Sequence, residues 1–85
     1  MKTSQRKIKD CFKVLGKNIS HVRKAKKMTL EQLGFDIGMD KSAMHHIENG
    51  KPITLTTLIK IAAVLEINTT TLLKNIPRLT KNDIL

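Results

Sequence analysis

The stretch from Thr29 to Gly50, TLEQLGFDIGMDKSAMHHIENG, contains two short helical patterns separated by a glycine-marked turn. The first pattern opens with Thr29 and has Gln32 three residues later, a capping box in which each side chain satisfies a free backbone N–H. Gly38 can adopt the left-handed conformation that ends a helix, and Asp40 is a good N-cap for the second pattern. These signals predict a helix-turn-helix.

The second helix of this pair has one apolar and one polar face. Met44 and Ile47 lie three residues apart on its inner side. The outward side chains are Lys41, Ser42, His45, His46 and Asn49. A polar helix face is commonly just solvated, but a turn of about 3–4 residues would hold this helix rigidly across the first. Such a helix can enter a DNA major groove, which is about 12 Å wide.

The same stretch resembles the Cro and lambda-repressor type of helix-turn-helix, also called the xenobiotic-response-element family. The resemblance runs from about Leu15 to Leu73, and its most specific segments are LEQLG and DIGMDKSAMHHIENG. It implies an all-α, five-helix, lambda-repressor-like DNA-binding domain. Gly34 replaces the family's usual Ala, which keeps the helix crossing close but costs about 1 kcal/mol of helix propensity. The loop Lys51-Pro52-Ile53 is shorter than in many members, so the start of the fourth helix is left open.

The resemblance also implies roles for individual side chains. Arg23 and Glu48 occupy positions at which relatives tend to form a partly buried ion pair between the first and third helices. The expected base-reading residues are Lys41, Ser42, His45 and His46, of which Lys41 can donate to guanine O6 and N7. The expected phosphate-binding residues are Thr29, Gln32, Asn49 and Lys51.

The positive charge of the chain is concentrated in its N-terminal part. The net charge is +9, and residues 1–27 carry ten Lys and Arg against Asp10 alone, whereas residues 28–85 carry six basic and six acidic residues. A basic arm of this kind is typical of nucleic-acid contact through counterion release. The alternative of a solubilising tail stays open, and a membrane-surface role is disfavoured because no tryptophan anchors are present.

An amphipathic helix is predicted beneath this charge. Its apolar positions are Ile8, Phe12, Leu15, Ile19 and Val22, spaced four, three, four and three residues apart. With Ser4 as its cap, the helix would run from about Gln5 to Lys26, with Gly16 as a weak point. Ile8 and Phe12 precede the resemblance, and they would cover either the C-terminal part of the chain or a partner subunit.

Two further helices are predicted after Gly50. Thr54 would cap the first, with an inner stripe made of Leu55, Leu58, Ile59, Ala62 and Leu65. Asn68 would cap a short second helix that carries Leu72 and Leu73. Pro77 ends the regular pattern, and LTKNDIL would form another turn, swap onto a partner or fray. The expected division is a basic extension (1–14), a helix-turn-helix domain (15–75) and a tail (76–85).

Several classes of function are disfavoured by the composition. With 85 residues, one small domain is expected, and no apolar run approaches the roughly 18–20 residues of a membrane span, so the cytoplasm is the expected location. Cys11 is the only cysteine, and no Cys and His spacing matches a metal site, so neither a metal nor a cofactor is expected. His45 and His46 point about 100° apart on a helix and are poorly placed to chelate one ion. No nucleophile and base constellation supports an enzyme, and two phenylalanines offer little for stacking single-stranded RNA.

The sequence therefore predicts a transcriptional regulator that binds a specific double-stranded DNA sequence. A lone domain of this size buries only about 600–1,000 Å² on DNA, which favours a homodimer on a two-fold operator. A second class of function stays open, an antitoxin-type interaction module that sequesters a toxin or other protein partner. Stand-alone relatives of this length serve as phage repressors, restriction–modification controllers and antitoxins, and no further domain in this chain separates these roles.

Overall fold

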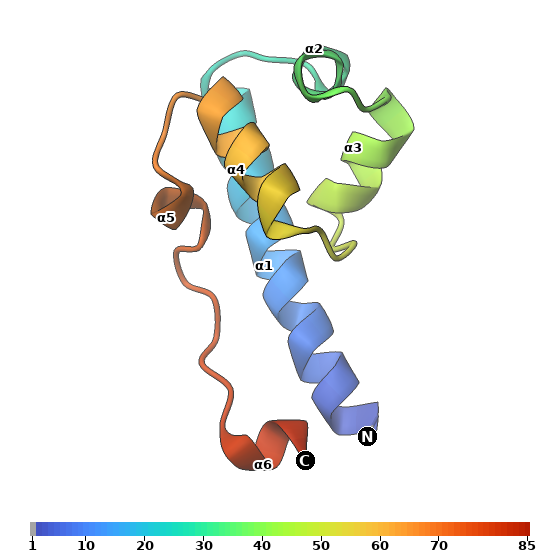
Figure 1. Ribbon diagram of the computed structural model, residues 1–85, viewed down its shortest axis with the longest axis vertical. Helices are drawn as coiled ribbons and strands as arrows, with labels where there is room; N and C mark the ends of the chain where they lie inside the picture. Colours follow the sequence, from blue (N-terminus) through green and yellow to red (C-terminus); the bar gives the residue numbers. More distant parts are fainter. Residues whose placement is uncertain (1) are drawn as a thin grey trace.

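The computed structural model describes the backbone of residues 2–85 and the side chains of residues 5–85. Within this part the chain forms α1 (Lys2–Ala25), α2 (Leu30–Ile37), α3 (Lys41–Glu48), α4 (Leu55–Val64), α5 (Thr69–Leu72) and α6 (Lys81–Ile84) (Figure 1). The predicted all-α class is confirmed. The five helices predicted for the domain are α1 to α5, and the tail adds α6. None of the helices described is long and apolar enough to cross a membrane.

The long helix α1 sets the length of the molecule, and α3, α5 and α6 all pack against it (Figure 1). At about 1.5 Å per residue, its 24 residues account for most of the longest dimension of 39 Å. The helix begins at Lys2, so the predicted start at Gln5 with Ser4 as N-cap is wrong, and Ser4 lies inside the helix. It ends one residue before the predicted Lys26, and Lys27 then turns the chain with a left-handed φ of 57°.

The predicted helix-turn-helix is formed by α2 and α3. In the capping box of α2, the Thr29 hydroxyl accepts a hydrogen bond from the Gln32 N–H at 3.1 Å, and Gln32 Oε1 accepts one from the Thr29 N–H at 2.8 Å. Gly38 ends α2 with a φ of 78°, and Asp40 caps α3 by accepting from the Ala43 N–H at 2.7 Å. Because both ends of this short turn are capped, the angle between the two helices is fixed locally.

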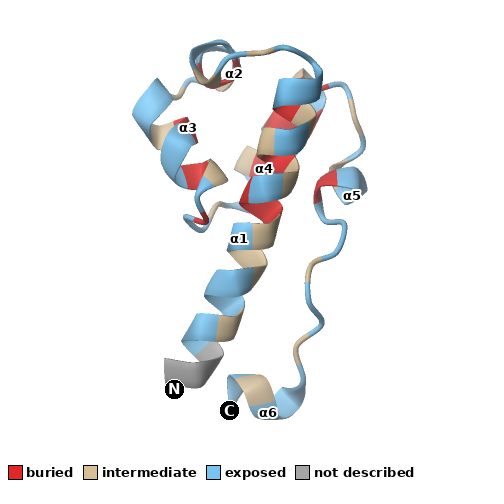
Figure 2. Cartoon of the chain, turned by 180° about the vertical axis from the view of Figure 1, so that it is seen from behind, coloured by how far each residue is buried: buried red, intermediate tan, exposed pale blue. Residues whose placement is uncertain are grey.

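The core lies where α1, the helix-turn-helix, α4 and α5 meet (Figure 2). Its buried apolar side chains are Leu15, Ile19, Leu33, Met44, Ile47, Leu58, Ile61, Ala62, Leu65 and Leu72. The inner stripe predicted for α4 is wrong at two positions, because Leu55 is 66% exposed and Ile59 is 50% exposed. Ile61, which that stripe omitted, is fully buried. Leu58, Ile61, Ala62 and Leu65 share one side of α4, and Ile59 lies about 100° around the helix from Leu58, outside that side.

The caps of the later helices are formed unequally. Thr54 caps α4 as predicted, and its hydroxyl accepts from the Thr57 N–H at 3.1 Å. Asn68 stands at the N-cap position of α5, but its side chain makes no capping hydrogen bond there. Leu72 is fully buried, whereas Leu73 is 41% exposed. The burial of Leu72, and not a side-chain cap at Asn68, therefore anchors the short helix α5.

Two glycines lie where backbone segments approach closely. A Cβ atom added at Gly16 would lie 2.5 Å from the Glu48 carbonyl oxygen and 2.7 Å from that of Ile47. At Gly34, such an atom would lie 2.5 Å from the Met39 carbonyl oxygen, which confirms the close crossing expected there. Gly16, predicted to be a weak point of α1 because of its helix propensity, also has a packing role, because its missing side chain lets α1 meet the end of α3.

An ion pair joins α1 to α3 beside this contact. Arg23 Nε donates to Glu48 Oε2 at 2.7 Å, and Arg23 Nη2 donates to Glu48 Oε1 at 3.0 Å. The third guanidinium nitrogen, Nη1, donates to the Met28 carbonyl oxygen at 2.7 Å. The two side chains are only 10% and 7% exposed. Each nitrogen of the guanidinium and each oxygen of the carboxylate thus has a partner, as a buried ion pair requires.

The C-terminal segment runs back along α1 (Figure 1). Asn18 Nδ2 donates to the Leu72 and Lys74 carbonyl oxygens at 2.9 and 2.7 Å. Cys11 Sγ donates to the Pro77 carbonyl oxygen at 3.7 Å, and Lys7 forms an ion pair with Asp83. Of the three alternatives for LTKNDIL, the structure shows a further helical turn that packs on the chain's own α1.

The pKa of Asp83 is lowered by its partners in the tail and on α1. Hydrogen bonds from Lys7 and from the Thr80 backbone lower the pKa of Asp83 from 3.8 to about 2. Because the folded-state pKa is depressed, the stabilisation is fully present above about pH 4 and is lost as the pH falls toward about 2. The Asp83 carboxylate that holds the tail is therefore ionised at neutral pH.

Replacing Gly16 with Ala is expected to destabilise the protein by about 1–3 kcal/mol, because the new methyl group meets carbonyl oxygens of α3 that cannot move independently. This loss opposes the gain of about 1 kcal/mol in helix propensity. Urea unfolding followed by circular dichroism measures the difference. The exposed neighbour Lys17 provides the control, and Lys17→Ala should change stability by less than about 0.5 kcal/mol. A Gly16→Ala protein as stable as the parent would contradict the close contact.

Truncating Glu48 to Ala is expected to lower the free energy of unfolding by about 3–5 kcal/mol, because it leaves the Arg23 guanidinium buried without its counter-charge. The double substitution Arg23→Met and Glu48→Leu should lower the free energy of unfolding much less. The matched control is Glu31→Ala in the exposed Glu31–Lys41 pair, which should cost no more than about 1 kcal/mol. Equal, small losses in all three proteins would show that burial of the Arg23–Glu48 pair has no energetic effect.

Candidate nucleic-acid interface

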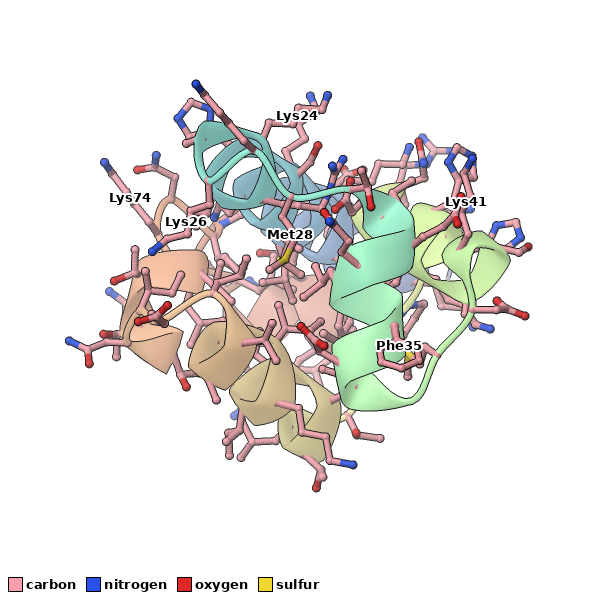
Figure 3. All side chains as sticks on the ribbon, turned by 90° about the horizontal axis from the view of Figure 1, so that it is seen from above. Lys24, Lys26, Met28, Phe35, Lys41 and Lys74 are labelled. Atoms are coloured by element: carbon pink, nitrogen blue, oxygen red, sulfur yellow. The ribbon has the colours of Figure 1, made fainter. Side chains whose placement is uncertain are left out.

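The polar face of α3 points into solvent, as its sequence spacing predicts. The exposed residues on it are Lys41, Ser42, His45 and His46, whereas Met44 and Ile47 are buried beneath them. Figure 3 places Lys41 at the side of the molecule that faces away from α4. At eight residues, α3 is about 12 Å long, so its whole polar face can lie within one stretch of a major groove.

Lys41 lies beside an acidic residue of α2. Its Nζ is 3.8 Å from Glu31 Oε1, and the two side chains are 64% and 73% exposed. An ion pair this exposed is worth at most about 1 kcal/mol. The ammonium group can therefore exchange Glu31 for an acceptor on a base edge at little energetic cost.

The two adjacent histidines form an edge-to-face pair. Their ring centroids lie 5.8 Å apart, with 66° between the ring planes. Both side chains are exposed, so each offers a ring nitrogen as donor or acceptor to a neighbouring molecule. Among the side chains described, no three His, Cys, Asp or Glu residues are grouped so that they could hold a metal ion.

The start of α2 presents free donors at one end of α3. The capping box uses the acceptor atoms Thr29 Oγ1 and Gln32 Oε1. The Thr29 hydroxyl proton and the Gln32 amide NH₂ group therefore remain to be donated. Together with the unsatisfied N–H groups and positive dipole end of the first helical turn, they form a surface that suits a phosphate oxygen.

The other end of α3 is closed by a Schellman turn. The helix ends at Glu48, and Asn49 is the C-cap. Gly50 has a φ of 105°, and the Lys51 N–H donates to the His46 carbonyl oxygen at 3.0 Å. Asn49 Nδ2 donates to the His45 carbonyl oxygen at 2.7 Å, which leaves Oδ1 and one amide proton of Asn49 for a ligand.

The structure thus distributes the predicted DNA-contacting residues over one continuous surface. The base-reading candidates lie along α3, with Thr29 and Gln32 at its first end and Asn49 and Lys51 beyond its last residue. Arg23 and Glu48 lie behind this surface and contact each other. Gln5 and Lys9 line a groove together with His46 and Lys51, and no spacing in the sequence predicted this groove. The positive charge of Lys9 was the only local signal.

Comparison with known families gives a match over residues 19–72, to the helix-turn-helix family model. No curated protein and no solved structure matches the chain. The matched part covers more than half of the chain and contains the Arg23–Glu48 pair, the capping box, α2, α3 and α4. The chain therefore belongs to the helix-turn-helix family of Cro and lambda-repressor type, whose members are DNA-binding transcription regulators.

Proposed function

We propose that this protein regulates transcription by binding a specific double-stranded DNA sequence with α3. The observation that carries the proposal is the exposed polar face of α3, held rigidly by caps at both ends and by the Arg23–Glu48 pair. A rigid helix loses little entropy when it enters the major groove, so its contacts contribute directly to affinity and to discrimination between bases.

Within this surface, the proposed roles follow from the position of each group. The proposed base-reading residues are Lys41, Ser42, His45 and His46. The proposed phosphate-binding residues are Thr29, Gln32, Asn49 and Lys51. Phosphate contacts at both ends of α3 would fix its register along the groove, whereas only the contacts between them would report the base sequence. The excess positive charge of α1 would add affinity for any DNA sequence.

A second copy of the chain is the proposed partner of the exposed apolar face on α4. Leu55, Ile59 and Leu73 are 66%, 50% and 41% exposed. Beside Leu55 lies an apolar hollow of about 280 Å³ between α1, α4 and the segment after α5. Residues 53–59 carry no charge in a chain of net charge +9, so two copies repel each other least at this face. A two-fold dimer would place the protruding leucine of each copy against the hollow of the other.

The dimer would also fix the spacing of the two recognition helices. The N-cap of α4, Thr54, follows the end of α3 by six residues. An interface at the start of α4 therefore lies close to α3 in both copies, which suits a two-fold operator. The antitoxin-type alternative would use the same apolar face for another protein and leave α3 without a role in reading DNA.

Replacing Lys41 or His46 with Ala is expected to weaken binding to the preferred DNA site by about 1–3 kcal/mol and to relax the preference at one or two base pairs, because a base-edge contact is lost. Asn49→Ala should instead weaken binding to preferred and random DNA together. Binding-site selection with each variant and the parent measures the preferences, and circular dichroism verifies folding, because Asn49 also caps α3.

An unaltered selected motif for folded Lys41→Ala and His46→Ala proteins would show that α3 does not read DNA. The antitoxin-type function would then become the better explanation of the exposed face on α4. A motif altered by either substitution, with non-specific affinity preserved, would support reading by α3.

The double substitution Leu55→Lys and Ile59→Lys is expected to convert a dimer into a monomer, because it places positive charges in an apolar interface. Sedimentation equilibrium measures the mass in solution. Phe35→Lys is the matched control, since Phe35 is 83% exposed on α2 and should not affect dimerisation (Figure 3). A dimer that survives the double substitution would place the interface elsewhere.

A further inference from the structure

The first part of α1 extends beyond the domain core as a rigid projection. The core residues of α1 begin at Leu15, and we refer to residues 5–14, the part of the predicted basic extension whose side chains are described, as the extension. On one side of the extension, Lys7 pairs with Asp83 and Cys11 Sγ contacts the Pro77 carbonyl oxygen. These contacts with the tail hold the helical backbone of the extension in place before any ligand binds.

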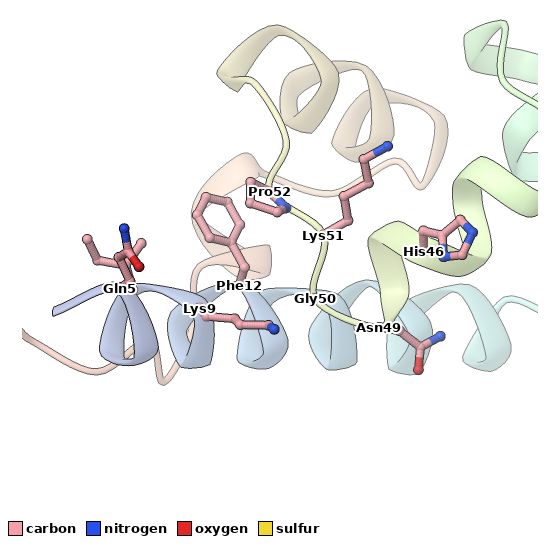
Figure 4. Close-up of a pocket in the computed structure, with 9 residues that line it drawn as sticks. Gln5, Lys9, Phe12, His46, Asn49, Gly50, Lys51 and Pro52 are labelled. Atoms are coloured by element: carbon pink, nitrogen blue, oxygen red, sulfur yellow. The ribbon is translucent and has the colours of Figure 1, made fainter. Parts of the chain in front are cut away.

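The other side of the extension forms a groove with the loop that follows α3 (Figure 4). The groove has a volume of about 650 Å³ and is lined by Gln5, Ile8, Lys9 and Phe12 of α1 and by His46, Asn49, Gly50, Lys51 and Pro52. Its lining combines an apolar part, which includes Phe12 and Pro52, with polar groups contributed by both walls. A ligand that fits must therefore offer both apolar and polar surface.

The charged groups of the groove are positive. Lys9 and Lys51 come from opposite walls, and none of the residues described as lining the groove is acidic. Neither lysine takes part in a salt bridge among the described side chains. Asp10 lines a different hollow, next to the tail, and so does not neutralise Lys9 within the groove. An anion would find two ammonium groups available there.

The groove is continuous with the surface proposed to bind DNA. His46 and Asn49 belong both to the proposed interface and to the groove. A DNA strand that passes the last turn of α3 would therefore run directly between Lys51 and Lys9. The match to the helix-turn-helix family begins at residue 19, so the wall formed by the extension lies outside the part of the chain that the family describes.

We propose that this groove binds the sugar–phosphate backbone of the DNA strand that flanks the base pairs read by α3. Lys9 and Lys51 would contact successive phosphates, and the deoxyribose would lie against Phe12 and Pro52. The inference rests on the proposed function of α3. A sugar–phosphate chain fits the groove because it is an extended polyanion whose sugars present carbon–hydrogen surface, whereas a small anion gains most from donors that converge on one point.

The test is Lys9→Ala, with Lys74→Ala as a control that removes the same charge. Both lysines are exposed, and Figure 3 shows Lys74 on the opposite side of the molecule from Lys41. The dependence of affinity on salt is measured for each protein, together with a hydroxyl-radical footprint. For Lys9→Ala, the slope of log K against log salt should fall by about 0.9, as expected for one lost phosphate contact. Protection of the flanking backbone should also be lost.

The selected base motif of Lys9→Ala should equal that of the parent, and Lys9→Arg should restore both the slope and the footprint. Lys74→Ala should leave both unchanged. Equal changes for Lys9→Ala and Lys74→Ala would show a delocalised charge effect and overturn the proposal, as would an unchanged slope, which would leave the groove to a protein partner. Failure of α3 to read DNA would appear separately, as an unaltered motif in the Lys41 and His46 variants.

Discussion

The guanidinium of Arg23 connects the three elements that determine where α3 lies. Two of its nitrogens donate to the Glu48 carboxylate at the end of α3, and the third donates to the Met28 carbonyl oxygen, next to the Thr29 cap of α2. The Glu48 carbonyl oxygen in turn lies against Gly16, two helical turns before Arg23 on α1. The last residue of α3 is thus fixed to α1 through both its side chain and its backbone. An isolated helix of eight residues would not be stable in water, so these contacts decide the orientation of its polar face.

This arrangement stabilises a particular geometry more than it stabilises the folded state. Burying two charges costs several kcal/mol of hydration for each ion, and their attraction and hydrogen bonds roughly offset that loss. Apolar side chains of similar volume would fill the same space. They would lack the bidentate contact and the third hydrogen bond, both of which depend on direction. A displacement of α3 by about 1 Å would take those bonds out of their normal range of length, whereas apolar packing is less sensitive to direction. For a helix proposed to align donors with base edges, this directional constraint is the more useful property.

The features predicted from residue spacing alone are those whose signals are local. The caps formed by Thr29, Asp40 and Thr54 each involve residues three apart, so a short segment contains the whole signal. The inner face of α4 was predicted only in part, because apolar residues surround much of that helix and contact with the rest of the core selects which of them are buried. The helix α6 is held by Lys7, which lies 76 residues before Asp83 in the sequence. The close approach at Gly16 depends on Ile47 and Glu48, which lie more than 30 residues away. Lys9 and Lys51 likewise meet across one groove only because the chain folds, and no spacing rule joins them.

In the proposed complex, sequence preference and general affinity for DNA would depend on different parts of the chain. The polar face of α3 lies within the matched family segment, and its contacts with bases would discriminate between sequences. The extension lies outside that segment, and a lysine on a phosphate would favour every sequence alike. The tail affects the second of these, because Asp83 pairs with Lys7 and so holds the backbone of the extension that carries Lys9. The ion pair therefore neutralises one positive charge of the basic arm, and it also restricts the motion of the extension. For phosphate binding, this ion pair is favourable when the ordering entropy saved on the extension exceeds the free energy that one exposed lysine would contribute.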